Sequence, residues 1–412
     1  MNKVVLLMSF CFFTVQLSVG IAGSLDTTFN STGPQPGTNS TTVSGFSTIR
    51  GIALQADGKL VVAGYASGYF ALARYNTNGT LDATFGSGGT VVTVIQTIDL
   101  GNSIVIQPDG KIVVAGSSAS GSTVYVALVR YNTDGTLDGT FGSGGKVLTY
   151  GGAAQNSAAF AIALQSDGKI VVAGRVGVGS SANIIVVRYN PDGSADTTFG
   201  TGGYGAGIVV SGVGSTSQAF GVAIQPNGKI VIAGIATIGS TLVFLIRYNT
   251  DGTFDSTFGS GGIVTTAVGS SSQANAVVIQ PDGKLLITGN SAGNLLLARY
   301  NTDGSLDSTF GTSGISVTLT GVVGRALALQ TDGKIVVSGG DPLVRLKANG
   351  SLDATFGVGG VATTPITGFV GAYGVAVQTD GKIVVGAEGG SGSGTFLVMR
   401  YLGGANIVNV CA

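Results

Sequence analysis

Short apolar runs separated by glycine-rich turns recur along the whole chain. One copy begins with QANAVVIQ at 273–280, passes through PDGK to KLLITG, and reaches NLLLARYN after a variable loop. NTDG and SLDSTFG follow, and GISVTLT ends the copy. Alternation is partial and several runs are apolar throughout, which predicts strands covered on both faces. Asp-Gly and Asn-Gly favour tight hairpins because glycine adopts positive φ at little cost. We therefore predict four strands per copy, named A to D in chain order.

Three markers recur in a fixed order, seven times each. The Asp/Asn-Gly-Lys turns begin at Asp57, Asp109, Asp167, Asn227, Asp282, Asp332 and Asp380. Strand C ends with a basic residue at Arg74, Arg130, Arg188, Arg247, Arg299, Arg345 and Arg400. The phrase Leu-Asp-x-Thr-Phe, with its first residue replaced twice, contributes Asp26, Asp82, Asp138, Asp196, Asp255, Asp307 and Asp353. Such a regular order indicates one repeated structural unit.

The order of the markers at the two ends predicts how the repeats close. The chain opens with the third marker at 24–29, before any strand C, whereas the last copy ends after Arg400 without a third marker. A ring accounts for both facts if the N-terminal strand completes the last blade, and it also hides two sheet edges. We therefore predict an all-β fold, a seven-bladed β-propeller of four-stranded blades, whose last blade combines N-terminal residues with Gly371–Leu402. An open β-solenoid is the alternative, although its coils usually repeat every ~20–30 residues.

The repeated phrases also resemble a known family. DGKIVVAG and ARYNTNGTLDATFGSGG, recurring about every 55 residues, are similar to the delta-60 repeat of bacterial proteins. This resemblance implies a propeller-like protein that is secreted or surface-associated, and it implies little about activity. The chain departs from the pattern at Asn227, at Arg345-Leu346, and in its truncated last copy.

The first residues carry the pattern of a secretory signal peptide. Lys3 precedes an apolar run from Val4 to Val19, and small residues suited to cleavage follow. We predict a signal peptide at 1–22, a single propeller domain at 23–412, and a secreted or cell-surface location. An uncleaved anchor is the alternative, but the run is shorter than the ~20 residues of a spanning helix, so we expect no membrane insertion of the mature chain. Cys11 would leave with the signal. Cys411 would then be a lone thiol, either incidental or paired with another chain, and we expect a monomer.

Composition removes several classes of function. The 20 basic and 20 acidic residues give no net charge, which argues against a nucleic-acid partner. The chain contains no histidine and a single glutamate, so histidine-based acid–base and zinc chemistry are absent, and we expect no metal and no cofactor. The run Asn132-x-Asp134-Gly135-x-x-Asp138 resembles part of a calcium loop without the full ligand pattern of an EF-hand. Plain hairpin chemistry competes with calcium there.

Residues present in every copy suggest structural roles. We expect the Asp of Leu-Asp-x-Thr-Phe to accept hydrogen bonds from backbone N–H groups or from the Thr two positions later. The Phe should pack between adjacent blades. The repeated Arg should pair with one of these Asp residues, contributing about 1 kcal/mol if partly exposed. Catalysis needs a unique constellation rather than seven equal ones, so we nominate no catalytic residue.

The loops between copies are the variable part of the chain. In a four-stranded blade the A–B and C–D turns share one face, and these are nearly constant; the D–A and B–C loops on the other face differ in length and sequence. Most charged residues outside the markers fall on this variable side. The ligand-binding candidates are Arg50, Asp99, Arg175, Arg325, Asp341 and Glu388.

These patterns favour a secreted, noncatalytic scaffold that binds a protein, a glycan or cell-surface material through the variable face, since function tends to reside in variable loops on a rigid frame. Two alternatives stay open. One is a glycan lyase or hydrolase using Asp, Tyr or Arg on that face. The other is a purely structural surface repeat protein.

Overall fold

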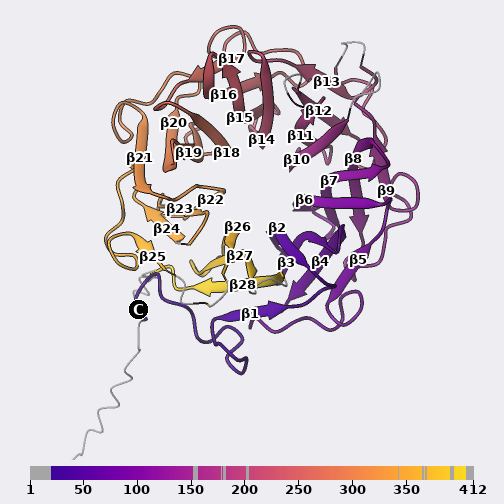
Figure 1. The fold of residues 1–412 in the computed structure, drawn as a ribbon, viewed down its shortest axis with the longest axis vertical. Coiled ribbons are helices and arrows are strands. Elements are labelled where there is room, and N and C mark those ends of the chain that lie inside the picture. The colour runs from indigo at the N-terminus through magenta and orange to yellow at the C-terminus, as the bar shows by residue number, and fades with distance from the viewer. Residues whose placement is uncertain are drawn as a thin grey trace, which may run out of the picture.

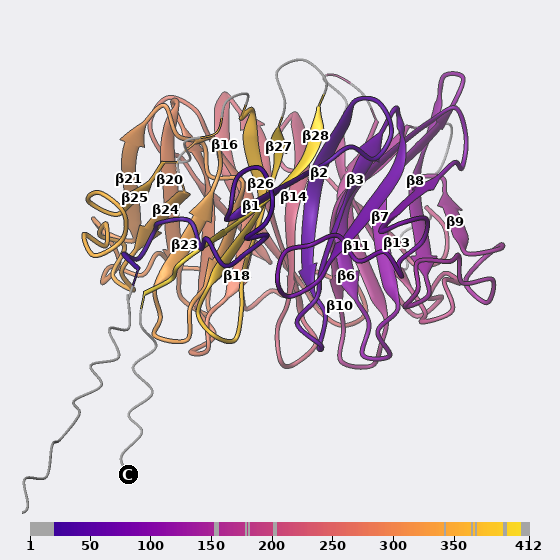
Figure 2. The ribbon, with the colours of Figure 1, turned by 90° about the horizontal axis from the view of Figure 1, so that it is seen from below.

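Seven four-stranded antiparallel sheets surround a central axis in the computed structural model (Figure 1). The structure describes residues 20–151, 156–177, 179, 182–200, 204–341, 343–363, 366, 369–389 and 394–404. Seen from the side, the blades form a disc with loops on both faces (Figure 2). The predicted seven-bladed β-propeller is confirmed. The described part of the chain has no helix with the length and apolar character needed to cross a bilayer.

Each blade runs from strand A at the central axis to strand D at the rim. Blades are numbered 1 to 7 in the chain order of their A strands, so β1 is the D strand of blade 7. The A strands are β2 Ser47–Leu54, β6 Ile98–Ile106, β10 Ser157–Leu164, β14 Thr216–Ile224, β18 Ser272–Ile279, β22 Ala326–Leu329 and β26 Gly371–Val377. The B strands are β3 Leu60–Ala66, β7 Ile112–Ser120, β11 Ile170–Val176, β15 Ile230–Ile238, β19 Leu285–Ser291, β23 Ile335–Ser338 and β27 Ile383–Gly389. The C strands are β4 Tyr69–Tyr75, β8 Thr123–Tyr131, β12 Asn183–Tyr189, β16 Ser240–Tyr248, β20 Asn294–Tyr300, β24 Leu343–Leu346 and β28 Thr395–Tyr401. The D strands are β1 Thr38–Thr41, β5 Thr90–Thr93, β9 Lys146–Thr149, β13 Ile208–Ser211, β17 Ile263–Thr266, β21 Ile315–Thr320 and β25 Val361–Ala362.

The ring closes as the marker order predicts. Strand β1 pairs antiparallel with β28 and forms the outer strand of a sheet ordered β1-β28-β27-β26. Its register places Thr38 opposite Met399 and Thr41 opposite Phe396. The N-terminal segment therefore supplies the strand that the last copy lacks, and the outer edge of β28 is covered.

The apolar core lies between neighbouring blades. Phe85, from the third marker, is fully buried in a cluster with Val61 and Leu72 of its own blade and Val114 and Val129 of the next. Equivalent clusters occur at the other junctions. Strands B and C are thus buried on both faces, which explains their unbroken apolar runs and confirms the predicted packing of the repeated Phe.

Two expectations concern the chain ends. Residues 1–19 of the predicted signal peptide at 1–22 lie outside the described residues. Cys11 and Cys411 lie outside them as well.

Candidate functional site

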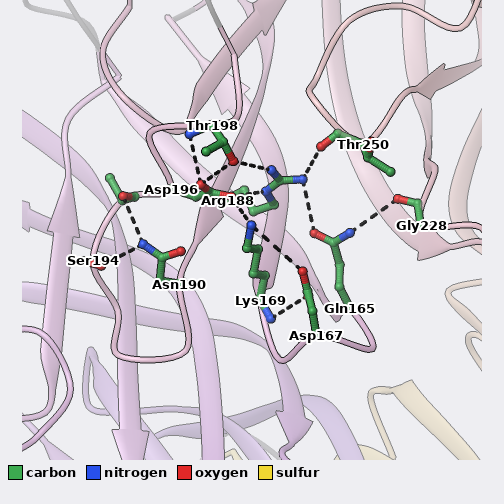
Figure 3. A network of polar contacts seen from close by, with 11 residues as sticks. Gln165, Asp167, Lys169, Arg188, Asn190, Ser194, Asp196, Thr198, Gly228 and Thr250 are labelled. Atoms are coloured by element: carbon green, nitrogen blue, oxygen red, sulfur yellow. Dashed lines mark hydrogen bonds and ion pairs between the residues drawn. The ribbon is translucent and has the colours of Figure 1, made fainter.

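The repeated acidic and basic residues form one cluster per blade on the face of the A–B and C–D turns. In blade 3, Arg188 Nε donates to Asp196 Oδ2 at 2.6 Å, and Lys169 Nζ lies 2.9 Å from the same oxygen (Figure 3). The other carboxylate oxygen, Oδ1, accepts from the backbone N and the Oγ1 of Thr198 at 3.0 and 2.7 Å. The predicted role of this Asp as an acceptor for backbone and Thr donors is confirmed.

The predicted pairing of the repeated Arg with this Asp is confirmed, and the pair is buried rather than partly exposed. Both side chains are 4% exposed in blade 3. Burial raises the pKa of Asp196, but the hydrogen bonds from Thr198, Lys169 and Arg188 outweigh it and hold that pKa well below its usual range. Breaking such a pair leaves an uncompensated buried charge, which costs about 3–5 kcal/mol rather than the small amount of a surface pair.

The contacts of Asp134 and Asp138 also concern the hypothesis that the Asn132–Asp138 turn binds calcium. Asp138 Oδ2 faces Arg130 Nε at 2.7 Å and Lys111 Nζ at 2.9 Å. Asp134 Oδ1 accepts from the backbone N and Oγ1 of Thr136. Within the described ranges no three His, Cys, Asp or Glu side chains come together as metal ligands. Asp134 thus accepts hydrogen bonds from its own hairpin, and Asp138 pairs with the Arg and Lys of the same blade.

The repeated Arg also links each blade to the next. Arg188 Nη1 donates to the backbone oxygen of Thr250 in the following C–D turn, and its guanidinium lies 4.5 Å from the Phe199 ring centroid. The same link recurs around the ring, including Arg299 to Ala348 at 2.7 Å and Arg400 to Thr77 at 2.6 Å. The residues common to every blade therefore hold the scaffold together and leave the central channel as the place for individual chemistry.

In six of the seven blades a β-bulge in strand A supplies one residue that faces the central channel. In blade 1, Ile49 pairs with Gly64 and Gly51 pairs with Ala63, so Arg50 is the extra residue. A Cβ added to Gly64 would lie 1.9 Å from the Thr48 backbone oxygen, a separation that real Cβ atoms do not show. The glycine of the IVVAG phrase thus permits the close approach of strands A and B that the bulge requires.

Seven equivalent positions together line a central channel of about 670 Å³. Six are bulge residues, and the seventh, Arg325, occupies the equivalent position just before β22. In blade order, this channel ring consists of Arg50, Asn102, Phe160, Phe220, Asn275, Arg325 and Tyr373. Their types differ from blade to blade, unlike those of the scaffold cluster.

One side of the channel ring is cationic and aromatic. The Arg50 and Arg325 guanidinium carbons lie 4.3 and 4.1 Å from the Tyr373 ring centroid, within the range of cation–π contacts. Arg50 Nη2 also donates to the Tyr65 hydroxyl at 3.3 Å. None of the residues that line the channel is acidic. This side therefore carries positive charge without a carboxylate beside it.

The opposite side of the channel ring is apolar, and amides separate the two. The ring centroids of Phe160 and Phe220 are 5.4 Å apart. Asn102 Nδ2 donates to the Ala159 backbone oxygen at 2.8 Å, and Asn275 Nδ2 donates to a backbone oxygen of blade 6 at 2.7 Å. Each amide thereby ties its own blade to the next one, which fixes the spacing of the channel ring.

The structure separates the six sequence-derived candidates. Arg50 and Arg325 line the channel, and the Arg175 guanidinium carbon lies 5.9 Å from the Phe160 ring centroid. Asp341 is exposed in the loop between β23 and β24. Asp99 and Glu388 differ from the other candidates because their side chains are buried, as described next.

Both of these acids lie on the variable side of the disc, but their side chains are buried and engaged. Asp99 is 0% exposed and accepts hydrogen bonds from the backbone of Ile95 and Gln96 and from the Ser118 hydroxyl. Glu388 is 8% exposed and accepts from Thr48 Oγ1 at 2.9 Å. Asp99 stabilises the loop before β6, whereas Glu388 contacts strand β2 of the neighbouring blade, so the candidates that line the channel are Arg50 and Arg325.

Sequence reasoning did not single out Asn102, Phe160, Phe220, Asn275 or Tyr373. The signal for them was a constant offset, because each channel-ring residue stands seven positions before the Asp or Asn of the next turn, as 50 does before 57. A change of residue type at one fixed offset, within an otherwise apolar strand, would have identified the channel ring.

Comparison with known proteins supports the fold. The family model described as Domain of unknown function (DUF5122) beta-propeller matches residues 55–85, 107–141, 165–199, 225–258, 280–310, 330–356 and 378–403. No curated protein sequence matches the chain.

Solved structures resemble the chain at low sequence identity. Selenomethionine-substituted virginiamycin B lyase from Staphylococcus aureus is 12% identical, with a TM-score of 0.52 over 89% of this chain and 99% of that one. A catalytically inactive histidine-to-alanine variant of that lyase with quinupristin is 11% identical, with a TM-score of 0.50 over 88% and 98%. A gluconolactonase from Xanthomonas campestris is 14% identical, with a TM-score of 0.42 over 72% and 85%. At these identities the likeness to the lyase concerns the fold alone.

Proposed function

We propose that the chain, which belongs to the family described as Domain of unknown function (DUF5122) beta-propeller, is a noncatalytic binding scaffold. Its ligand enters the central channel from the side of the D–A and B–C loops. The observation that carries this proposal is the channel ring, in which seven equivalent positions hold Arg, Asn, Phe, Phe, Asn, Arg and Tyr. One backbone geometry accommodates all of these types, so the fold does not dictate them. Four residue types, with the charged ones gathered on one side of the cavity and the phenylalanines on the other, suit recognition of an asymmetric ligand.

The chemistry of the channel favours binding over catalysis. A glycan hydrolase needs a pair of accessible carboxyl groups, whereas the channel lining contains none, and Asp99 and Glu388 are buried. The lyase that shares the fold has a variant inactivated by the loss of a histidine, and this chain contains no histidine. The hollow, charged channel also favours binding over a purely structural role, for which a flat and uncharged face would suffice.

In this proposal the ligand is located outside the cell. The signal-like segment at 1–22 supports export, and the resemblance to delta-60 repeats supports a surface or secreted location. The partner is then a protein, a glycan or another component of the cell surface, and the scaffold acts as a monomer. Fractionating cells that express the full chain, and determining the N-terminus of the exported form, tests this location.

A binding screen on the mature chain tests the function. Surface proteins and glycans would be presented to the wild type and to a channel variant carrying Arg50→Gln, Arg325→Gln and Tyr373→Leu. We expect the channel variant to lose binding while its unfolding midpoint stays close to that of the wild type. Lys146→Gln with Lys347→Gln is the matched control, because it removes two positive charges away from the channel and should bind normally. Retained binding by the channel variant would contradict the proposal.

A further inference from the structure

Building on the proposed function, we propose that the channel binds the carboxylate of an apolar or aromatic acid. Arg50 and Arg325 hold the carboxylate, and Phe160 and Phe220 contact the apolar part. Blades 6, 7 and 1 supply the cationic side of the channel ring, whereas blades 3 and 4 supply the aromatic side across the axis (Figure 1). The ligand must therefore carry its charge at one end and its apolar surface at the other.

The cationic side is built to accept an anion. Arg50 and Arg325 come from the two blades that flank Tyr373, and both guanidinium groups lie against that one ring. Stacking on an aromatic face leaves the N–H groups at the edge of a guanidinium available for a carboxylate. The two positive charges repel each other, and neither forms a salt bridge with a carboxylate of the described chain. A bound carboxylate would relieve this repulsion.

The aromatic side offers apolar surface inside the same cavity. Phe160 and Phe220 are only partly buried, and both line the channel together with Ile162 and Val222. Aromatic rings with their centroids 5.4 Å apart form a compact apolar surface. Releasing water from this surface favours a ligand with an apolar ring or chain.

The amides argue against a hydroxyl-rich ligand such as an acidic sugar. The Nδ2 groups of Asn102 and Asn275 already donate to the backbone of the next blade. Gln273 Nε2 donates to Asn275 Oδ1 at 2.8 Å, which uses one of the two lone pairs of that acceptor. Sugar hydroxyls that lost their water in the channel would find few replacement partners, and an unpaired buried hydroxyl is costly.

Ligand-observed NMR and calorimetry on the mature chain test the ligand class with three probes. These are N-acetyl-L-phenylalanine, its carboxamide, and D-glucuronate. We expect the acid to bind about tenfold or more tightly than the amide, the ratio expected when a charged hydrogen-bond acceptor is removed. We expect D-glucuronate to bind more weakly than the acid. Equal affinity for acid and amide, or tighter binding of D-glucuronate, would overturn the inference.

Variants assign the binding to the two sides of the channel ring. The double variant Arg50→Gln, Arg325→Gln should abolish the preference for acid over amide. The double variant Phe160→Ser, Phe220→Ser should lower the affinity for both the acid and the amide. The control Lys146→Gln with Lys347→Gln should change neither the preference for acid over amide nor the affinity for the two probes. An acid preference that survives the loss of both channel arginines would overturn the inference.

A further arm separates the two sources of such an acid. A short peptide ending in a free C-terminal phenylalanine would bind at least as tightly as the free acid if the natural ligand is a protein C-terminus, and more weakly if it is a free aromatic acid. A surface ligand that depends on the channel but shows no acid preference would leave the proposed function standing and refute only this ligand class.

Discussion

Arg400 Nε donates to Asp26 Oδ2 at 2.7 Å, although 374 positions separate the two residues in the sequence. Their side chains are 6% and 4% exposed, and Lys382 Nζ lies 3.2 Å from the same oxygen. In the other six blades the equivalent Arg and Asp belong to one hairpin, eight positions apart. The seam of the ring therefore uses the same buried Arg–Asp pair as every other blade, with its Asp supplied by the opposite end of the chain.

Replacing Asp26 with Asn should destabilise the closed ring by about 3–5 kcal/mol, because Arg400 and Lys382 lose the buried charge that compensates them. Urea unfolding followed by circular dichroism measures the change. Asp57→Asn is the matched control, since Asp57 is exposed and blade 4 naturally carries Asn227 at the equivalent position. Similar losses in both variants would contradict the compensation of buried charge by Asp26.

Gly64→Ala should destabilise blade 1 by more than about 2 kcal/mol, because its Cβ would collide with the Thr48 backbone oxygen across the bulge. Thermal unfolding measures the shift. Gly139→Ala is the control: its Cβ meets no atom within 4 Å, and the equivalent residue in blade 1 is Ala83. That change should be neutral or slightly stabilising, as expected for glycine in a conformation that alanine also adopts. Tolerance of Gly64→Ala would show that the bulge does not need glycine.

Phe85→Ala should cost about 3–5 kcal/mol, the usual penalty for emptying a fully buried aromatic site. The site lies between blades 1 and 2, so the loss weakens a junction between blades. Phe254→Ala removes the same atoms from a side chain that is 43% exposed, and it should cost clearly less. Chemical denaturation of both variants measures the two losses in unfolding free energy. Equal losses would contradict the view that burial of this Phe between blades stabilises the ring.

Stability should be nearly constant from about pH 6 to pH 8 and fall steeply in acid. The chain has no histidine to titrate in that interval. In all seven third-marker Asp residues burial raises the pKa, but hydrogen bonds and nearby cations outweigh it and lower the folded-state pKa below the ordinary value.

Since the unfolded chain takes up protons at these groups first, their contribution is complete above about pH 5 and is lost as the pH falls through 4 toward the folded values. Urea unfolding between pH 8 and pH 3 measures this slope. Asp82→Asn should make the acid slope shallower, because it removes one of the carboxyl groups whose folded-state pKa is lowered. A steep dependence between pH 6 and pH 8 would contradict the account.

The architecture could be predicted because its determinants are local and repeated. Each Asp-Gly-Lys turn fixes one hairpin, and the missing third marker after Arg400 identifies the partner of the N-terminal strand. The roles of the repeated Asp, Thr and Phe followed from their spacing. The burial of the Arg–Asp pair did not, because it depends on the next blade covering it.

The channel could be predicted only in part. Arg50 and Arg325 stood out because charge is rare in this chain, but the bulge that directs them inward breaks the simple alternation of a strand. The uncharged members of the channel ring, such as Tyr373, carried no such mark. Asp99 and Glu388 were conspicuous for the same reason as the arginines, yet nothing in the sequence reveals that loop N–H groups and hydroxyls surround their carboxylates.

Pairing β1 with β28 has a consequence for synthesis. Among the described strands, Thr38–Thr41 is synthesised first, and its partner Thr395–Tyr401 is synthesised last. Until then the first six blades can form in their order along the chain, while strand Thr38–Thr41 remains unpaired. Contacts of such large sequence separation form slowly. Completion of the ring is thus a late event, and an incomplete chain presents an open strand edge to its surroundings.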